Sequence, residues 1–485
     1  MDSIIKTKPK QRFPDWYKIA PNDLTARRYG TKETVDIWGA EKTYEYSLRV
    51  QGESSLVLSE LHPDIVPPEL AREISEKASL EYINSNRIRQ LEEEKGHDVV
   101  AINLALGEVV GQPAKAHINK AKTSADTTQP AKALQLKESL EVIADSTENL
   151  RDILIEKSLE WINIPHMDNT HLYDALPTVL GRPLSHYVEM LQSNLIFIKF
   201  VYENSIMGKW ADATGNHHSA VALGIDGMKL QEKFCEKLGI GFMDAPAQIP
   251  GLEFEMDIFY VMARLGETMN NIAKYIAWGK SDDVNIFLDA NPKKRKGSSA
   301  MPHKDAKGGN PTKEEQNMSN RNYLAGNLMT AIMNCEIPYA RNLAASSNFR
   351  INAEDGFKFL DHNIRELANL SYYLGANEER CRERVERSFG ITTSQWVLTY
   401  LTDQRRVTSV MTRKQGDEIL GELAISAWKN KTQFLDVLLE NEEITSRLNK
   451  DILVQITDAF EYRGQSKEIV QLVAGKYYKK KTLEG

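Results

Sequence analysis

The sequence predicts an all-α protein organised around a bundle of long helices. Three observations support this fold class. Apolar residues recur at steps of three and four over several segments of twenty or more residues, as on one face of a helix. Short alternating segments typical of strands are scarce, and helix-breaking residues gather in a few polar stretches. A chain of 485 residues should divide into about two or three domains.

Three long helices are expected in the middle of the chain. The first covers roughly residues 131–161, beginning after Pro130, and the second runs from Leu184 to about Asn204. The third, Phe254 to Ile276, carries a continuous apolar stripe that approaches a heptad repeat. Stripes of this length suit helices that pack side by side in a bundle.

Polar segments rich in glycine and proline mark the boundaries between the expected domains. One lies at residues 120–130 and a denser one at about 289–311, where long loops are often functional. Beyond about Gly375 the expected helices are shorter. We therefore expect an N-terminal helical domain at 1–122, a central bundle at 123–375 and a C-terminal helical domain at 376–485.

Composition and charge exclude several classes of protein. The net charge of −7 argues against a general nucleic-acid binder. The three cysteines are far apart, so neither a disulfide framework nor a zinc site is expected, and His217-His218 lacks further metal ligands at suitable spacing. The sequence has no signal-like N-terminus and no run of about 18 apolar residues. We expect a cytoplasmic protein that needs no metal and no membrane.

The loop at 289–311 contains Gly297-Ser298-Ser299-Ala300-Met301-Pro302-His303-Lys304. A hydroxyl and an ammonium on one mobile loop could close over an anionic substrate, where the ammonium would stabilise developing negative charge. From composition alone, a flexible basic surface loop is the alternative interpretation.

The segment GSSAMPHK closely resembles the GSSxMPxK loop of the fumarase–aspartase superfamily. Five further segments, in the expected order, are similar to those of its adenylosuccinate lyase family. They are RYGTKETVDIW from Arg28, GHDVVA around His97, TSAD from Thr123, THLYDALPTVLGR from Thr170, and SSNFR after Arg341. The resemblance covers most of the chain. It implies a three-domain all-α fold with a central long-helix bundle, and a homotetramer whose active sites are each built from three subunits.

The resemblance also implies a reaction, the β-elimination of fumarate from adenylosuccinate to give AMP in purine nucleotide biosynthesis. Succinylaminoimidazole carboxamide ribotide is expected as a second substrate. Elimination requires a base and an acid on opposite faces of the substrate. By resemblance, Ser298 is the base, His171 the acid that protonates the leaving nitrogen, Glu315 the carboxylate that orients His171, and Lys304 the carbanion stabiliser. No cofactor is implied.

The resemblance assigns the binding residues to two ends of the substrate. The phosphate and ribose are expected on Arg28, Tyr29, Arg341, Ser346 and Arg350, with His97 and Asp98 also facing the nucleotide. The succinyl carboxylates are expected on Thr123, Ser124, Ser299 and Asn310, with Gln248 as a further substrate ligand. Without the resemblance, His97 could be structural, Thr123 and Ser124 could only cap a helix, and Arg341 could form a surface ion pair.

The chain departs from the family pattern at several places. Asp305 to Gly309 lengthen the loop before Asn310, and Tyr173 replaces a glutamine. Gly96 stands where the family has an arginine, and neither Gly251 nor Leu252 supplies another. The alternatives are therefore a related lyase for a different N-succinyl or argininosuccinate-type substrate, or an inactive paralogue.

Overall fold

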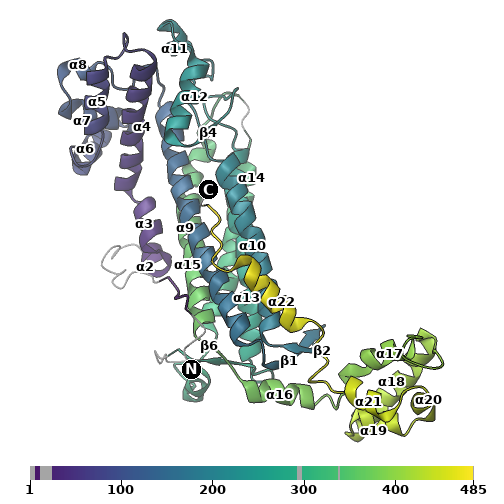
Figure 1. The fold of residues 1–485 in the computed structure, drawn as a ribbon. Helices are drawn as coiled ribbons and strands as arrows, with labels where there is room; N and C mark the ends of the chain where they lie inside the picture. Colours follow the sequence, from purple (N-terminus) through teal and green to yellow (C-terminus); the bar gives the residue numbers. More distant parts are fainter. Residues whose placement is uncertain (1–5, 11–23, 292–297, 337–338, 484–485) are drawn as a thin grey trace.

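The computed structural model describes residues 6–10, 24–291, 298–336 and 339–483. Its centre is a bundle of long helices that run along one another (Figure 1). The bundle helices are α9 (Ala125–Glu160), α10 (Gly181–Asn204), α13 (Glu253–Lys280), α14 (Thr312–Asn334) and α15 (Ala344–Tyr372). The predicted all-α class is confirmed.

The apolar stripe read from the sequence lies inside the bundle. Ile258, Met262, Leu265, Met269 and Ile272 of α13 are all buried in one continuous core. Burying such a stripe supplies most of the stability of a long helix, because helix propensity alone is weak. The predicted helices at 184–204 and 254–276 are therefore confirmed, each extended by a few residues.

The start predicted for the first long helix is wrong, because α9 begins at Ala125 and contains Pro130. Proline removes an intrahelical hydrogen bond, so the extra turn before it needs another source of stability. Asp126 supplies it. This carboxylate is fully buried and paired with the ammonium of Lys209, 2.5 Å away. The start of α9 is thus set by a contact between residues that are distant in the sequence, which a local sequence pattern cannot predict.

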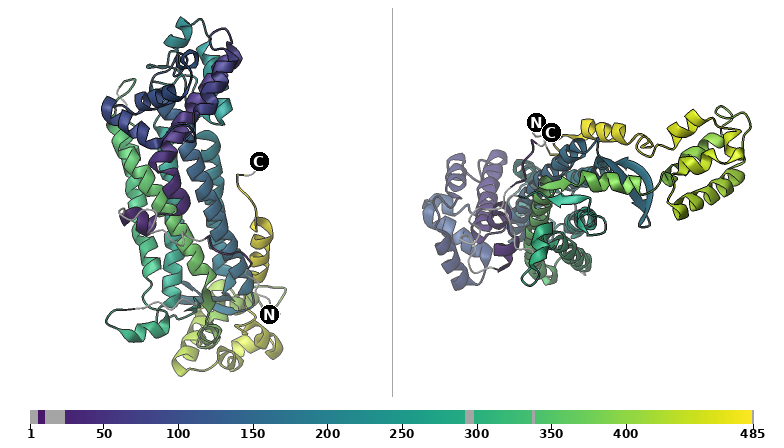
Figure 2. Two further views of the ribbon diagram at one scale, coloured as in Figure 1. Left: turned by 90° about the vertical axis from the view of Figure 1, so that its left-hand side faces the viewer. Right: turned by 90° about the horizontal axis from the view of Figure 1, so that it is seen from below.

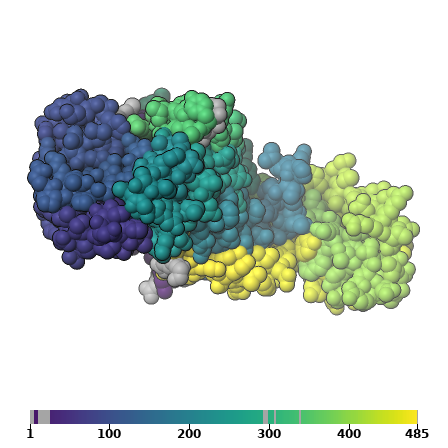
Figure 3. Space-filling model, turned by 90° about the horizontal axis from the view of Figure 1, so that it is seen from above, coloured from purple at the N-terminus to yellow at the C-terminus, as the bar shows by residue number. Residues whose placement is uncertain are grey.

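Groups of shorter helices lie at the two ends of the bundle (Figures 1 and 2). The N-terminal group has its own apolar core, as does the C-terminal group from Val397 to Ile456, which projects beyond the bundle (Figure 3). The N-terminal group and its neighbours are α2 (Leu24–Tyr29), α3 (Lys32–Ile37), α4 (Ala40–Leu61), α5 (Pro68–Lys77), α6 (Ser85–Lys95), α7 (Asp98–Val109), α8 (Gln112–Lys115), α11 (His218–Ala222) and α12 (Gly227–Leu238). The later elements are η1 (Pro302–Lys307), α16 (Glu378–Glu386), η2 (Ile391–Thr393), α17 (Ser394–Leu401), α18 (Arg413–Asn430), α19 (Phe434–Leu439), α20 (Glu442–Thr445), α21 (Lys450–Ile456) and α22 (Ser466–Tyr477).

The last helix and a segment near the start of the chain both return to α9 and its neighbours. Helix α22 packs on α10, and Val473 joins the core of the bundle. The carboxylate of Glu156 on α9 accepts hydrogen bonds from the backbone N–H and the hydroxyl of Thr7 and from the hydroxyl of Tyr478. One side chain of α9 therefore fastens two segments that are distant in the sequence.

Strands occur only as two-stranded pairs among the described residues. The pair β1 (Pro165–Thr170) and β2 (Tyr173–Val179) forms an antiparallel hairpin at the lower end of the bundle (Figure 1). The other pairs are β3 (Met207–Gly208) with β4 (Gly241–Phe242), and β5 (Phe287–Asp289) with β6 (Leu374–Ala376). No described helix combines the length and the apolar character that a membrane crossing requires.

Candidate active site

One set of predicted residues meets at the upper end of the bundle. The hydroxyl of Ser124 lies 3.2 Å from Nε2 of His97, and Nδ1 of the same imidazole lies 3.2 Å from the carboxylate of Asp98. Ser124 is the residue that precedes α9, yet its side chain makes no capping hydrogen bond. The capping interpretation of Ser124 is therefore wrong, and its hydroxyl faces a histidine instead.

The turn that carries Thr123 and Ser124 is held by the buried Asp126. Its carboxylate accepts the backbone N–H of Thr123 at 2.8 Å and that of Ala211 at 3.0 Å, beside the ammonium of Lys209. Burial lowers the pKa of Lys209, and the charge of Asp126 opposes that shift. Because a buried charge without its partner is costly, this pair fixes the turn firmly.

Arg341 lies next to this turn with no ion pair among the described residues. Its Nε is enclosed and has no hydrogen-bond partner. Burial lowers the pKa of Arg341, while the charges of Asp98 and Glu255 raise it. The backbone of Gln248 donates to the carbonyl of Ala340 at 3.3 Å, which brings Gln248 beside Arg341. The alternative of a surface ion pair is not seen among the described residues, and the guanidinium remains available for an anion.

We call these residues the upper cluster: His97, Asp98, Thr123, Ser124, Gln248 and Arg341. Ser346 lies beside the upper cluster, in the first turn of α15. The residue before it, Ala345, packs against the apolar side chains of Ala125 and Ile249.

The two places where the family has arginines offer no cation here. Gly96 ends α6 in the left-handed conformation with φ of 64°, which glycine adopts without strain. Leu252 is buried against Ala125 and Ile249. Each of these two residues thus serves the local fold, and Arg341 is the arginine that the upper cluster itself contains.

The remaining nucleotide-binding candidates lie apart from the upper cluster. Arg28 is exposed on α2, and Arg350 is exposed on α15. Tyr29 packs edge-on against Phe359 and His362 of α15, with ring centroids 5.1 and 5.3 Å away. Among the described residues, no hydrogen bond or ion pair joins Arg28, Tyr29 or Arg350 to the upper cluster, so one chain does not gather them around a single ligand.

A second set of predicted residues lies on residues 298–311, which we call the serine loop. The hydroxyl of Ser298 accepts the backbone N–H groups of Ala300 and Met301, at 3.3 and 3.0 Å. Ser299 is exposed. Gly297, the first residue of the predicted motif, lies outside the described residues. Two amide donors aimed at one oxygen stabilise negative charge on it.

The lengthened part of the serine loop still brings Asn310 to Lys304. The ammonium of Lys304 donates to the side-chain oxygen of Asn310 at 2.9 Å. Between them, Gly308 and Gly309 both adopt left-handed backbone with φ of 81° and 84°, and the N–H of Gly309 returns to the carbonyl of Lys304. The extra residues are therefore absorbed in a tight turn that keeps the two side chains together.

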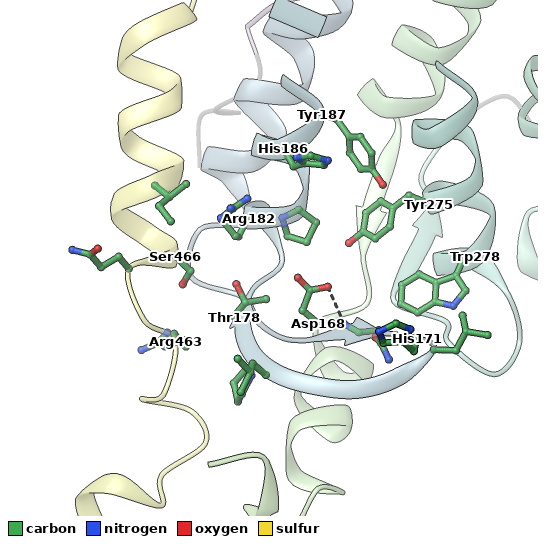
Figure 4. Close-up of a pocket in the computed structure, with 17 residues that line it drawn as sticks. Asp168, His171, Thr178, Arg182, His186, Tyr187, Tyr275, Trp278, Arg463 and Ser466 are labelled. Carbon is green, nitrogen blue, oxygen red and sulfur yellow. Dashed lines mark hydrogen bonds between the residues drawn. The ribbon is translucent and has the colours of Figure 1, made fainter. Parts of the chain in front are cut away.

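His171 lies at the tip of the β1–β2 hairpin, far from the upper cluster. It lines a cavity of about 750 Å³ with Asp168, Arg182 and Tyr275, between the hairpin and α22 (Figure 4). Glu315 is exposed in the first turn of α14. Among the described residues, no hydrogen bond or ion pair joins His171 to Glu315 or to the serine loop.

The length of the bundle separates the upper cluster from His171. Helix α9 has 36 residues and is therefore about 54 Å long. Ser124 precedes this helix and His171 follows it, so no small molecule can contact both in one chain. The two sets form one site only if different chains supply them.

One residue of the upper end was missed from the sequence. Lys209 forms a buried ion pair with Asp126. The sequence feature that could have indicated it is a lysine directly before Trp210 in an otherwise apolar stretch. The described residues contain no group of three or more histidine, cysteine or acidic side chains placed to hold a metal.

Comparison with known proteins gives a family match and full-length relatives. A family model described as "Lyase" matches residues 31–321, more than half of the chain. An adenylosuccinate lyase of Methanocaldococcus jannaschii is 27% identical over 447 residues, which cover 92% of this chain and 94% of the relative. An adenylosuccinate lyase of Bacillus subtilis is 27% identical over 442 residues, which cover 91% and 97%.

Solved structures share the fold at lower identity. A fumarate lyase from a Mesorhizobium species has a TM-score of 0.78 at 17% identity, covering 93% of this chain and 100% of that one. A 3-carboxy-cis,cis-muconate lactonizing enzyme from Pseudomonas putida has a TM-score of 0.79 at 18% identity, covering 94% and 99%. Because differently named enzymes share this architecture, the fold alone does not determine the reaction.

Proposed function

The chain belongs to the lyase family whose model matches residues 31–321, and from this membership we propose that it releases fumarate from adenylosuccinate to give AMP. The observation that carries the proposal is the similarity, nearly from end to end, to adenylosuccinate lyases of an archaeon and a bacterium. Cleavage of succinylaminoimidazole carboxamide ribotide is part of the same proposal, which makes the protein an enzyme of purine nucleotide biosynthesis.

The proposed chemistry is a β-elimination with no bound cofactor. Ser298 takes the proton from the carbon beside a carboxylate, and the electron pair of that C–H bond forms the double bond of fumarate. The C–N bond breaks, and His171 donates a proton to the departing nitrogen. The amides of Ala300 and Met301 stabilise charge on the Ser298 oxygen, which supports the role of this hydroxyl as the base.

Lys304 and Asn310 are placed together to act on the succinyl half of the substrate. The ammonium of Lys304 stabilises the negative charge that develops on the carboxylate beside the carbanion. Asn310, 2.9 Å away, holds both the ammonium and a carboxylate oxygen in place. Ser299 assists this contact, and Glu315 orients His171 of another chain.

The upper cluster would bind the nucleotide and one succinyl carboxylate. Arg341 pairs with the phosphate in a bidentate geometry, assisted by Ser346 beside it, with Arg28, Tyr29 and Arg350 supplied by neighbouring chains. His97 and Asp98 face the nucleotide, while Thr123, Ser124 and Gln248 hydrogen-bond the succinyl end.

The separation of the candidate residues supports a homotetramer with shared active sites. A bundle about 54 Å long keeps Ser124 and His171 apart in one chain. Antiparallel packing of several bundles would bring the upper cluster of one chain to the hairpin of the next. We further propose a division into domains at 1–122, 123–375 and 376–485, and a cytoplasmic location, which suits the three free cysteines.

The ultraviolet absorbance of fumarate tests the proposal directly. The full-length protein is mixed with adenylosuccinate, with succinylaminoimidazole carboxamide ribotide, with argininosuccinate and with other N-succinyl amines. Turnover of the first two compounds is expected. If only argininosuccinate or another N-succinyl amine is cleaved, the proposed substrate is wrong and that compound takes its place. No turnover of any compound by a folded oligomer would identify an inactive paralogue.

A further inference from the structure

The tip of the β1–β2 hairpin has little in its own backbone or packing to hold it in place. His171 and Leu172 form a two-residue turn in which both φ angles are positive, 53° and 70°. Such turns normally carry asparagine, aspartate or glycine, because side chains with a Cβ rarely adopt this conformation. Leu172 and Tyr173 are 86% and 80% exposed, so no apolar packing holds the tip. An isolated two-stranded hairpin is only marginally stable.

A network of hydrogen bonds and ion pairs holds the hairpin directly below the turn. The guanidinium of Arg384 donates to the carboxylate of Asp174 at 2.6 Å and to the side-chain oxygen of Asn169 at 2.9 Å. Arg387 donates to the other oxygen of Asp174 at 2.8 Å, and the amide of Asn169 donates to Asp174 at 3.1 Å. Asn169 and Asp174 are paired across the two strands. The network therefore locks the register of the hairpin one pair below the turn.

Arg384 is itself fixed by its surroundings. Its side chain is only 3% exposed, and its guanidinium stacks over the ring of Trp278 at 5.4 Å. Helix α16 carries Arg384, is followed directly by Arg387, and packs on β1 through Val385 and Met167. Burial opposes the charge of Asp174, yet the hydrogen bonds from Arg387 and Arg384 keep the pKa of this carboxyl below its ordinary value. Asp174 is therefore a charged anchor between the hairpin and a rigid helix.

We propose that Asp174, with Arg384 and Arg387, positions His171 for proton transfer to the leaving nitrogen. Asp174 lies three residues beyond His171 and is the first side chain after the turn with strong contacts to the rest of the protein. It does not touch the substrate and acts only through the hairpin. This inference rests on the proposed function, since it assumes that His171 is the acid.

Steady-state kinetics of the full-length oligomer test the proposal. Asp174→Ala should lower kcat about 10- to 100-fold, because a misplaced catalytic group loses most of its rate advantage. KM should change less than about 3-fold, because the upper cluster is untouched. Asp174→Asn keeps an oxygen that can accept from Arg384 and should recover part of the loss. Glu383→Gln removes a carboxylate from an exposed ion pair with Arg380 on the same helix, and should match the unmodified protein.

Digestion with chymotrypsin gives a readout that needs no activity. The bonds after Leu172 and Tyr173 should be cut faster in Asp174→Ala than in the unmodified protein or in Glu383→Gln. An unchanged kcat in Asp174→Ala, or a fall in kcat that follows loss of the folded oligomer, would overturn the positioning role. Failure of the unmodified protein to release fumarate would instead remove the proposed function, and the digestion would still report on the anchor.

Discussion

The two ends of the bundle present their polar side chains in opposite ways. At the upper end, Ser124, His97 and Asp98 contact one another, and the buried Asp126–Lys209 pair holds the turn beneath them. At the lower end, His171 stands exposed at the tip of a hairpin, and Glu315 is exposed on α14. The upper residues thus contact one another within one chain, whereas among the described residues no hydrogen bond or ion pair joins His171 to Glu315.

This contrast suggests a division of labour between substrate binding and proton transfer. Groups that bind a nucleotide benefit from being preassembled, because ordering them on binding would reduce affinity. Groups that transfer protons need only meet once the substrate is enclosed. Substitutions at the lower end should therefore affect kcat, and substitutions at the upper end should affect KM.

The largest effect is expected from Ser298→Ala in the serine loop, where Gly308 lies against Asp289 of β5, the partner strand of β6 at the lower end of the bundle (Figure 1). Loss of the base should reduce kcat about 10²- to 10⁴-fold, the usual contribution of general acid–base catalysis. Fumarate release is the measurement, and equilibrium binding of adenylosuccinate should be nearly unchanged. If kcat is retained, a different group is the base. A large loss of binding instead would contradict the contrast between the two ends.

A mixture of two inactive variants tests whether the lower groups come from different chains. His171→Ala and Ser298→Ala would be co-expressed, so that their chains assort at random. About one quarter of the sites would then receive both native residues, restoring about one quarter of the activity. Activity no higher than that of either variant alone would mean that one chain supplies both residues.

A smaller effect is expected from Arg341→Ala at the upper end. Hydrogen bonds to a charged group contribute about 1.5–3 kcal/mol, so KM should rise about 10- to 100-fold while kcat changes less. Arg264→Ala is the matched control, since Arg264 contacts Ser193 elsewhere on the bundle. A fall in kcat at unchanged KM would place Arg341 in the chemical step and break the proposed division.

The smallest effect concerns the stability of the upper end. Burial lowers the pKa of Lys122, next to Thr123, to about 7. In the unfolded chain a lysine titrates near about 10.4, so the unfolded state binds this proton more tightly between the two values. The free energy of unfolding should therefore rise as the pH rises through that window, by about 1.4 kcal/mol for each pH unit.

Thermal unfolding at about pH 6.5 and about pH 9 measures this dependence. Lys122→Met should flatten it, and Lys233→Met, which removes an exposed lysine, should not. An equal slope in both variants would show that Lys122 is not the group responsible.

The sequence predicts the bundle well because a long apolar stripe has few alternative structures. The helices at 184–204 and 254–276 follow from that periodicity. Periodicity cannot predict the start of α9, because the turn before Pro130 depends on Lys209, more than eighty residues later. The β1–β2 hairpin was also missed, since its turn uses His171 and Leu172 in place of the usual asparagine or glycine.

The candidate site was predicted residue by residue, but its arrangement was not. The motifs identify Ser124 and His97, which the structure places 3.2 Å apart. They do not reveal that Gly308 and Gly309 close the lengthened loop and keep Asn310 beside Lys304. Nor does one sequence show how other chains would meet this one, so the roles of all the candidate residues, Arg28, Glu315 and Arg350 among them, stay predictions.

The carboxylate of Glu156 binds two segments of the chain that are synthesised at very different times. Thr7 leaves the ribosome early and Tyr478 late, yet both donate hydrogen bonds to this one side chain. The contact of Thr7 requires α9, and the contact of Tyr478 requires both α9 and α22. A donor dye near Thr7 and an acceptor dye near Tyr478 would therefore report the final closure of the fold as one event, and Glu156→Gln would loosen both ends together.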